Sequence, residues 1–377
     1  MRKPSPKRRT SKSSTPCWAW TSRSLRALRV HLARQGRAPW AAKEACTMRG
    51  QPLANPPGRR VAVIANGSQP EPEKLARQYC RDRAVPEQHL ILLRCTTSET
   101  IPEGDYLTDI QSPVRTALRE RKLADKIDFL LVVKGVPIKT AQRSFSVDSL
   151  LMCMNLSVPV RSRNPYFGRK ETFSSTRYGG LYLVSRLDGY TFSDAGALVE
   201  RALKARREDG LFLLDISPSH RRSAYGEVNE SMRRAAEMLK RKKLRVLLDD
   251  TKAFIGNQKG VMGYYSWGSN DPEYKKELYL SNTFLPGAIA ETAVSTSART
   301  FLPTDKGQSL IADLIRVGVT GVKGYVSEPY ADALCRADIL FDRYTDGYTL
   351  AESFWMATPY LFWRDMVVGD PLCAPYA

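Results

Sequence analysis

The sequence predicts an α/β protein, a three-layer α/β/α sandwich built around a mostly parallel sheet. Two observations predict this class. Short apolar runs alternate with longer amphipathic segments along the chain. The apolar runs are continuous rather than alternating, which is typical of parallel strands covered by helices on both faces. With 377 residues, the chain is long enough to bury a sizeable core.

Each element is expected from its own stretch of sequence. The expected strands are 61–66, 89–94, 127–135, 181–189, 211–216, 245–250, 261–265, a run that begins at 287, and 319–326. The expected helices are 71–83, 105–122, 193–207, 229–242, 307–316 and 349–357. Pro113 splits or kinks the second of these helices. Residues 144–180 fit neither pattern, so a long irregular excursion is expected there.

One domain over residues 59–377 is the simplest architecture, and two domains split near Ser144 are the alternative. Residues 1–58 are expected to form a disordered basic tail. The first sixty residues hold 15 Lys and Arg and a single acid, Glu44, against a net charge of +19 for the chain. A charged tail is a weaker sign of nucleic-acid binding than a basic stripe on a folded face. Specific nucleic-acid binding is therefore not expected.

The sequence leaves the cellular location open. The tail lacks the apolar core of a secretory signal. No apolar run approaches the roughly 18–20 residues that cross a membrane, so no transmembrane segment is expected. The chain is expected to be either cytoplasmic or exported from a different start, for which Met48 is a candidate.

Cysteine and histidine spacing predicts neither a metal site nor a disulfide framework, and no cofactor is expected. The seven cysteines are scattered without a CxxC pair, and the chain has three histidines. A Cys–His dyad is not expected either. His89 begins a strand and His220 lies in a polar loop, so neither histidine is expected near the strand ends that carry the candidate site.

Small polar and charged residues gather where the apolar runs end. The clearest case is the stretch 260–299, where one strand breaks into Ser-Trp-Gly-Ser-Asn-Asp and another into Ser-Thr-Ser-Ala-Arg. In open α/β sheets, ligands bind beyond the carboxyl ends of the strands. We therefore expect a binding pocket lined by Lys134, Arg186, Asp188, Ser266, Trp267, Asn270, Asp271, Ser295, Thr296, Arg299 and Glu328. Weak catalytic candidates are Ser295, Ser297, Asp188 and Glu328.

Structural roles compete with each of these assignments. Small polar residues at strand ends also form turns. The Lys134 side chain can extend to water instead of binding an anion. Arg186 and Asp188 can form an ion pair that fixes a turn. Asp148 is expected to cap the helix that follows it.

Nine motifs, in order from Lys134 to Tyr376, resemble an uncharacterised bacterial family found in genomes with the PEP-CTERM/exosortase sorting system, and the resemblance covers nearly everything from Arg60 to Tyr376. They read KGVPI, SVDS, NPYF, LYLVSRLDG, GYYSWGSND, PGAIAETAVSTSAR, GQSLIADLIRVGVTGVKGYVSEPY, LAESFWMATPY and VVGDPLCAPY. More distantly, the C-terminal half resembles gingipain-type cysteine peptidases of the caspase–haemoglobinase fold. The resemblance implies a caspase-like arrangement of the sandwich.

The peptidase chemistry does not carry over with the resemblance. Trp267 stands at the position that resembles the peptidase histidine, and an indole nitrogen only donates. The segment that resembles the nucleophile strand reads Val294-Ser295-Thr296-Ser297, without a cysteine. The resemblance therefore implies a peptidase-like protein without the Cys–His dyad, a binding or accessory module for peptide or a cell-surface polymer. The alternative is a hydrolase that uses Ser295 or Ser297, or a carboxylate-activated water, in the equivalent pocket.

Overall fold

The computed structural model describes residues 57–220 and 223–377. The expected tail lies almost wholly outside the described residues, so its disorder stays a prediction. The division of the chain into domains likewise stays a prediction. Within the described ranges, no helix is long and apolar enough to cross a membrane.

Ten strands form one sheet, in the order β2-β1-β4-β7-β14-β12-β11-β10-β8-β9. They are β1 (Val61–Asn66), β2 (Leu90–Leu93), β4 (Phe129–Val133), β7 (Leu183–Leu187), β8 (Leu211–Asp215), β9 (Arg245–Asp249), β10 (Val261–Ser266), β11 (Phe284–Thr292), β12 (Gly321–Tyr325) and β14 (Asp365–Gly369). β12 and β14 pair antiparallel, whereas β2-β1-β4-β7 and β12-β11-β10-β8-β9 pair parallel. The expected α/β class with a mostly parallel sheet is confirmed.

The register of the sheet brings strand ends level with one another. Ser266, the last residue of β10, lies opposite Thr292, the last residue of β11. At the end of β4, Val133 lies opposite Leu187 of β7. The residues that follow each pair of strands therefore leave the sheet side by side, which is the geometry the candidate site requires.

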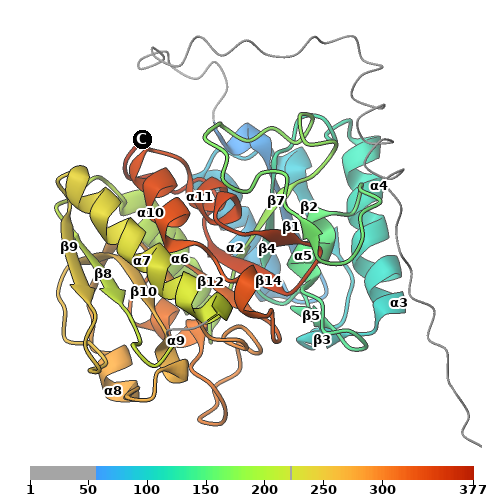
Figure 1. Ribbon diagram of the computed structural model, residues 1–377. Helices are drawn as coiled ribbons and strands as arrows, with labels where there is room; N and C mark the ends of the chain where they lie inside the picture. The colour runs from blue at the N-terminus through green and yellow to red at the C-terminus, as the bar shows by residue number, and fades with distance from the viewer. Residues whose placement is uncertain (1–56, 221–222) are drawn as a thin grey trace, which may run out of the picture. The chain divides into compact units, whose positions relative to one another are not determined.

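Helices cover both faces of the sheet (Figure 1). One layer contains α2 (Pro70–Asp82), α6 (Phe192–Lys204) and α9 (Ile311–Arg316), and the other contains α7 (Ser223–Arg241), α10 (Ala337–Thr345) and α11 (Leu350–Met356). Strand β12 shows how close the packing is. A Cβ atom on Gly321 would lie 2.1 Å from Leu350 of α11, and one on Gly324 would lie 3.0 Å from Ile311 of α9. Glycines on alternate faces thus admit both layers.

Capping residues explain where two of these helices begin. Thr191 accepts a hydrogen bond from the Asp194 backbone, and the Asp194 carboxylate accepts one in return. Thr349 and Glu352 form the same reciprocal pair at the start of α11. Such capping boxes satisfy backbone N–H groups that lack a partner within the helix.

The helix expected over 105–122 is interrupted as predicted near Pro113. Residues Glu103–Asp105 form α3, Tyr106–Gln111 form a π-helical segment, and Ser112–Glu120 form α4. Proline has no N–H to donate to the preceding turn, so the wider π-turn lies directly before it.

The excursion over 144–180 is not wholly irregular. It contains α5 (Val147–Met152), and β6 (Ser162–Arg163) pairs with β13 (Tyr360–Leu361). The remaining short elements are β3 (Thr100–Ile101), β5 (Lys139–Thr140), α8 (Lys276–Tyr279) and the 3₁₀ turns Pro57–Arg60, Glu87–His89, Gly268–Asn270 and Ala331–Ala333.

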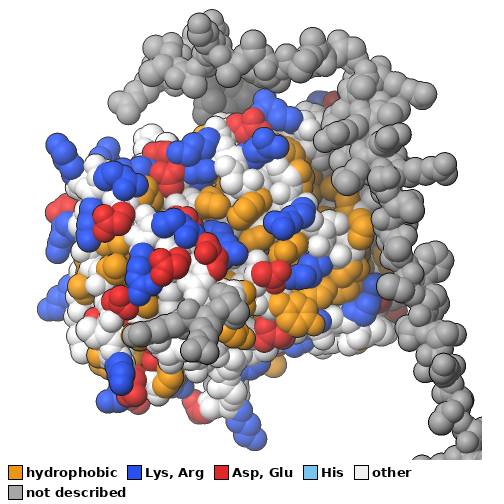
Figure 2. Space-filling model, viewed as in Figure 1, with side chains coloured by type: hydrophobic (Ala, Val, Ile, Leu, Met, Phe, Trp, Pro, Cys, Tyr) orange, Lys and Arg blue, Asp and Glu red, His pale blue; other side chains and the backbone are white. Residues whose placement is uncertain are grey.

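Charges are interspersed on the face that carries α7 and α10. Figure 2 shows acidic and basic side chains side by side over these two helices. Arg233 lies 2.7 Å from Asp250, and Arg234 lies 2.7 Å from Asp338. Most of the positive charge on this face is therefore locally balanced.

Three ionisable side chains lie fully buried where β11, β12 and β14 meet. Lys323 Nζ lies 2.7 Å from Asp365 Oδ1. Glu291 Oε1 accepts a hydrogen bond of 2.9 Å from the Tyr325 hydroxyl, and its other oxygen has no partner. Burial raises the pKa of Glu291 to about 8, although the Lys323 charge opposes the shift. Glu291 is therefore mostly protonated in the folded protein at neutral pH.

This buried acid predicts a loss of stability as pH rises. In an unfolded chain the pKa of a glutamate is about 4.3. Between that value and about 8, the folded state holds a proton that the unfolded state has released. The free energy of unfolding therefore falls with rising pH, by up to about 1.4 kcal/mol per unit.

Urea unfolding at pH 5, 6, 7 and 8 tests this. Glu291→Gln keeps an acceptor for Tyr325 and should lose less stability than the unmodified chain across that range. Asp215, whose pKa burial raises to about 7, titrates in both proteins and cancels in the difference. Parallel pH profiles for the two proteins would show that Glu291 does not titrate in this window.

Candidate functional site

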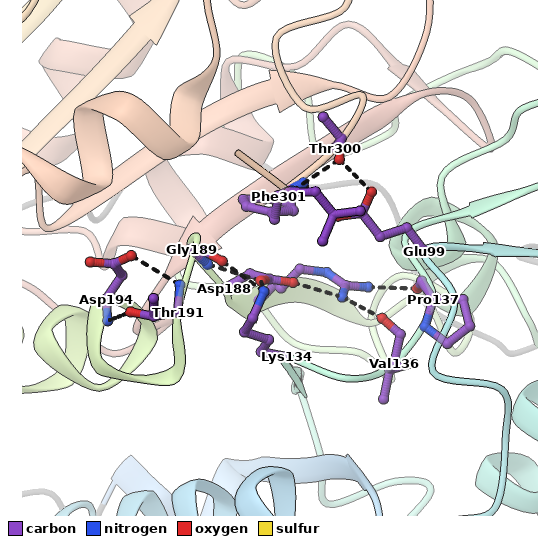
Figure 3. Close-up of polar contacts among 12 residues, drawn as sticks. Glu99, Lys134, Val136, Pro137, Asp188, Gly189, Thr191, Asp194, Thr300 and Phe301 are labelled. Carbon is purple, nitrogen blue, oxygen red and sulfur yellow. Dashed lines mark hydrogen bonds and ion pairs between the residues drawn. The ribbon is translucent and has the colours of Figure 1, made fainter. Parts of the chain in front are cut away.

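A buried network of ion pairs lies at the carboxyl ends of β4 and β7 (Figure 3). Lys134 Nζ lies 3.0 Å from Asp188 Oδ1 and 2.7 Å from the carbonyl oxygen of Gly189. Arg186 Nη2 lies 2.6 Å from Asp148 Oδ1, and its Nη1 lies 3.3 Å from Asp188 Oδ2. Two cations and two carboxylates therefore neutralise one another.

Every remaining donor of Arg186 is also used within the protein. Its two terminal nitrogens donate to the carbonyl oxygens of Val136 and Pro137, at 2.8 and 3.0 Å. Burial lowers the pKa of Arg186, but the charges of Asp148 and Asp188 outweigh that effect and the pKa is raised. Burial also raises the pKa of Asp148, against the opposing pull of Arg186. The ion-pair alternative for Arg186 and Asp188 thus describes this site.

The expectation that Asp148 caps its helix is wrong. The N-cap of α5 is Ser146, whose side chain accepts a hydrogen bond of 3.3 Å from the Ser149 backbone. Asp148 is fully buried in the first turn and pairs with Arg186 instead. A charge partner distant in sequence draws the carboxylate away from the local backbone.

The Trp267 side chain, at the end of β10, is buried and fully engaged. Its indole Nε1 donates to Asn229 Oδ1 at 2.7 Å. Its ring stacks on the imidazole of His220, with centroids 4.0 Å apart. His220 Nε2 lies 2.9 Å from the carbonyl oxygen of Asn270. The expectation that His220 lies away from the strand-end residues is therefore wrong, because its polar loop folds back over β10.

One glutamine joins the segments that follow β10 and β11. Gln308 Oε1 accepts hydrogen bonds from the hydroxyl and the backbone N–H of Thr296, at 2.6 and 3.0 Å. Gln308 Nε2 donates to Asn270 Oδ1 at 2.8 Å, and Asn270 Nδ2 donates to the carbonyl oxygen of Ala293. Arg299 donates to the carbonyl oxygens of Thr296 and Gln308. These predicted site residues hold a loop in place.

The other predicted residues differ in exposure. Ser266 and Ser297 are fully buried; Ser266 Oγ accepts from the Gly268 backbone at 3.1 Å, and Ser297 Oγ accepts from Tyr325 at 3.4 Å. Asp271 is buried and accepts from the Glu273 backbone. Ser295 is half-buried and has no hydrogen bond within the described residues.

Glu328 lies apart from these groups. It is exposed, and its carboxylate accepts a hydrogen bond of 2.9 Å from the Tyr330 backbone. The carboxylate therefore closes its own turn rather than extending across the strand ends.

The two clusters lie along one edge because the loop after β11 binds Glu99, just before β3, and Lys139 of β5. Glu99 accepts hydrogen bonds from the Thr300 hydroxyl and the Phe301 backbone N–H (Figure 3). Lys139 Nζ donates to the carbonyl oxygen of Arg299 at 2.9 Å. The Lys134 ammonium lies 5.9 Å from the centre of the Phe301 ring. The structure thus brings most of the predicted residues to one edge, but in two internally bonded groups.

An aspartic acid at the end of β8, Asp215, has a strongly raised pKa. Burial raises the pKa of Asp215 to about 7, and the charges of Asp249 and Asp271 add to the shift. One oxygen accepts from the Ile255 backbone at 3.0 Å, and the other is buried without a partner. A carboxyl group that titrates near neutrality is suited to general acid–base chemistry.

The five cysteines in the described residues are all free and buried. Burial raises the pKa of Cys80 and of Cys95 to about 11, and of Cys153 and of Cys373 to about 12. Cys335 is shifted in the same direction. Nucleophilic cysteines carry the opposite shift, because the thiolate is the reactive form. Within the same residues, no three His, Cys, Asp or Glu side chains are placed to hold a metal ion.

Sequence reasoning missed Glu99, Asn229, Thr300, Phe301 and Gln308. None of them is the last residue of a strand, so the search for polar residues at strand ends did not identify them. Gln308 stands within one of the quoted motifs, which is the one feature that singled it out.

The Arg186 network predicts a large effect of removing its cation. Arg186→Met leaves Asp148 buried without a counter-charge, which should lower the free energy of unfolding by about 3–5 kcal/mol. Urea unfolding measures the loss, with Arg119→Ala on the exposed face of α4 as the control. A loss below about 1 kcal/mol would mean that the network is not needed for folding.

Comparison with known proteins gives the fold alone. No family model matches the chain, and no curated protein does. A solved structure described as "Structure of Protease" is similar to this chain, with a TM-score of 0.52 and 11% sequence identity. The match covers 85% of this chain and 79% of the solved one. The chain therefore has a distant protease-like α/β fold.

Proposed function

We propose that this protein is a peptidase-fold binding module that lacks a Cys–His dyad. Its partner would be an extended peptide or a cell-surface polymer held along the edge where β4, β7, β10 and β11 end. The observation that carries the proposal is the use of Trp267. The indole at the position resembling the peptidase histidine is buried and donates to Asn229.

The neighbouring position supports the same conclusion. The segment that resembles the nucleophile strand offers Ser295, Thr296 and Ser297. Ser297 is buried against β12, and Thr296 is bonded to Gln308. Ser295 has no basic group within hydrogen-bond reach among the described residues. Serine is a weak nucleophile without an adjacent base.

Cysteine chemistry elsewhere in the described residues is disfavoured by the same reasoning. All five thiols are buried and shifted toward the protonated form. The hydrogen bonds of His89 and His220 go to backbone carbonyl oxygens. These features support binding over cysteine-dependent hydrolysis.

A hydrolase remains the second candidate because one observation favours it. Asp215 titrates near neutrality and has a buried oxygen without a partner. A carboxylate in this state could activate a water molecule, with Ser295 as the other candidate nucleophile. Asp215 is the last residue of β8, and Ser295 lies in the segment that follows β11. One strand, β10, lies between these two in the sheet.

Labelling with a fluorophosphonate probe separates these two functions for the serines. We expect no labelling of the native chain, because Ser295 lacks a base. The comparison is with Ser295→Ala and Ser297→Ala. Labelling of the native chain that is lost in either variant would overturn the binding proposal. Hydrolysis of a mixed peptide pool that Asp215→Asn abolishes would overturn it as well.

Peptide binding is tested by thermal shift and by a peptide array. A bound peptide should raise the melting temperature, because binding at 100 times Kd adds about 2.7 kcal/mol. Ser295→Trp places a bulky ring on the edge and should reduce binding at least tenfold. Leu203→Trp, on an exposed position of α6, is the matched control. Equal binding by both variants would place the peptide elsewhere.

A further inference from the structure

A separate cavity lies between the π-helical segment, α4 and α5. Its volume is about 240 Å³, the space of about eight water molecules at roughly 30 Å³ each. Its apolar lining comes mainly from Leu150, Met154, Leu156 and Phe362. A concave, largely apolar site with a few polar groups is the usual form of a small-molecule site, and this cavity has that form while remaining partly open to solvent.

A buried hydroxyl in the lining lacks a partner. Tyr106 is 2% exposed, and its hydroxyl makes no hydrogen bond with any described residue. Leaving such a group unpaired costs about 1–3 kcal/mol. Tyr106 begins the π-helical segment, and π-turns are frequent at functional sites. The hydroxyl is therefore a buried donor beside the cavity that no group of the described chain uses.

The wall opposite contributes backbone strain. Phe362 lines the cavity with φ of +54°, in the left-handed region that side chains other than glycine rarely occupy. Strain of this kind costs on the order of 1–3 kcal/mol and gathers at functional positions.

The charged side chains of the lining carry a net positive charge, because one arginine has no carboxylate partner. Arg143 is bound by both oxygens of Glu103, at 2.8 to 3.1 Å, so this pair is neutral. Arg115 donates to the carbonyl oxygen of Met154 and has no carboxylate partner among the described residues. Burial raises the pKa of the Tyr106 phenol, and the charge of Arg115, which is exposed, opposes that shift. The lining thus holds one guanidinium without a carboxylate partner and one hydroxyl without a hydrogen bond among the described residues.

We propose that this cavity binds a small carboxylic acid with an apolar body. The carboxylate would accept from the Tyr106 hydroxyl and the Arg115 guanidinium, and the apolar part would pack on Leu150, Met154 and Phe362. Arginine is suited to this role because it binds carboxylates with two parallel hydrogen bonds. The proposal is independent of any binding at the edge formed by the strand ends.

Calorimetric titration of the full chain with 3-phenylpropanoate tests the proposal, with the uncharged 3-phenylpropanamide as the matched probe. The acid should bind saturably and at least tenfold more tightly than the amide. Arg115→Ala should remove that preference. Arg119→Ala, one turn further along α4 and outside the lining, should leave it unchanged. Equal affinities for acid and amide, or no saturable binding of the acid below about 10 mM, would overturn the proposal.

Two further variants distinguish a loss of binding from a failure to fold. Tyr106→Phe removes an unpaired buried hydroxyl, so the free protein should melt at the same or a higher temperature while acid binding weakens. Leu107→Trp, at a position that is 50% exposed and lines the cavity, should fill the mouth and weaken binding of both probes. Undiminished acid binding in these two variants would mean that the acid binds outside this cavity.

Discussion

A guanidinium that is completely removed from water constrains this fold more than any other single group. Arg186 projects from β7 with no exposed surface, and burying an unpaired charge would cost several kcal/mol. The chain meets that demand with Asp148 from α5, Asp188 from its own strand and two carbonyl oxygens after β4. The excursion that begins near residue 144 is therefore fixed against the end of the sheet.

A second contact holds the other half of the edge. Glu99 binds the backbone and hydroxyl of the Thr300–Phe301 turn, and this turn continues the loop that leaves β11. Lys139, in the segment that follows β4, adds a second hydrogen bond to the same loop at the carbonyl oxygen of Arg299. The edge is thus a set of loops bonded to one another, and most of the polar groups there serve the protein itself. This is why a surface with many candidate groups offers few free ones.

Much of the fold could be predicted from the sequence because continuous apolar runs are a local property. The runs at 61–66 and 127–135 required no knowledge of their neighbours. β14 was missed, since its five residues follow an aromatic and charged stretch, and no strand was expected after 319–326. The role of Asp148 was also missed, because its partner lies in another strand.

The candidate site was harder to predict for the same reason. Strand-end position drew attention to Lys134, Trp267 and Thr296, which lie in the segments that follow β4, β10 and β11. It gave no sign that Ser297 is buried, which follows from Gly324 on the next strand, where a Cβ would lie 2.8 Å from Ser297 Oγ. Nor did it place His220 on the Trp267 ring. Partners distant in sequence decide whether a polar group is available.

The position of β14 has a consequence for synthesis. It follows the other nine strands of the sheet along the chain, yet it lies between β7 and β12 in the middle of the sheet. Asp370, just after β14, accepts hydrogen bonds from Tyr79 and Arg83, which lie 291 and 287 residues earlier in the sequence. On a ribosome, the ten-stranded sheet cannot be completed until β14 emerges. Contacts of such sequence separation slow folding, and the exposed strand edges of the incomplete sheet invite mispairing with other nascent chains.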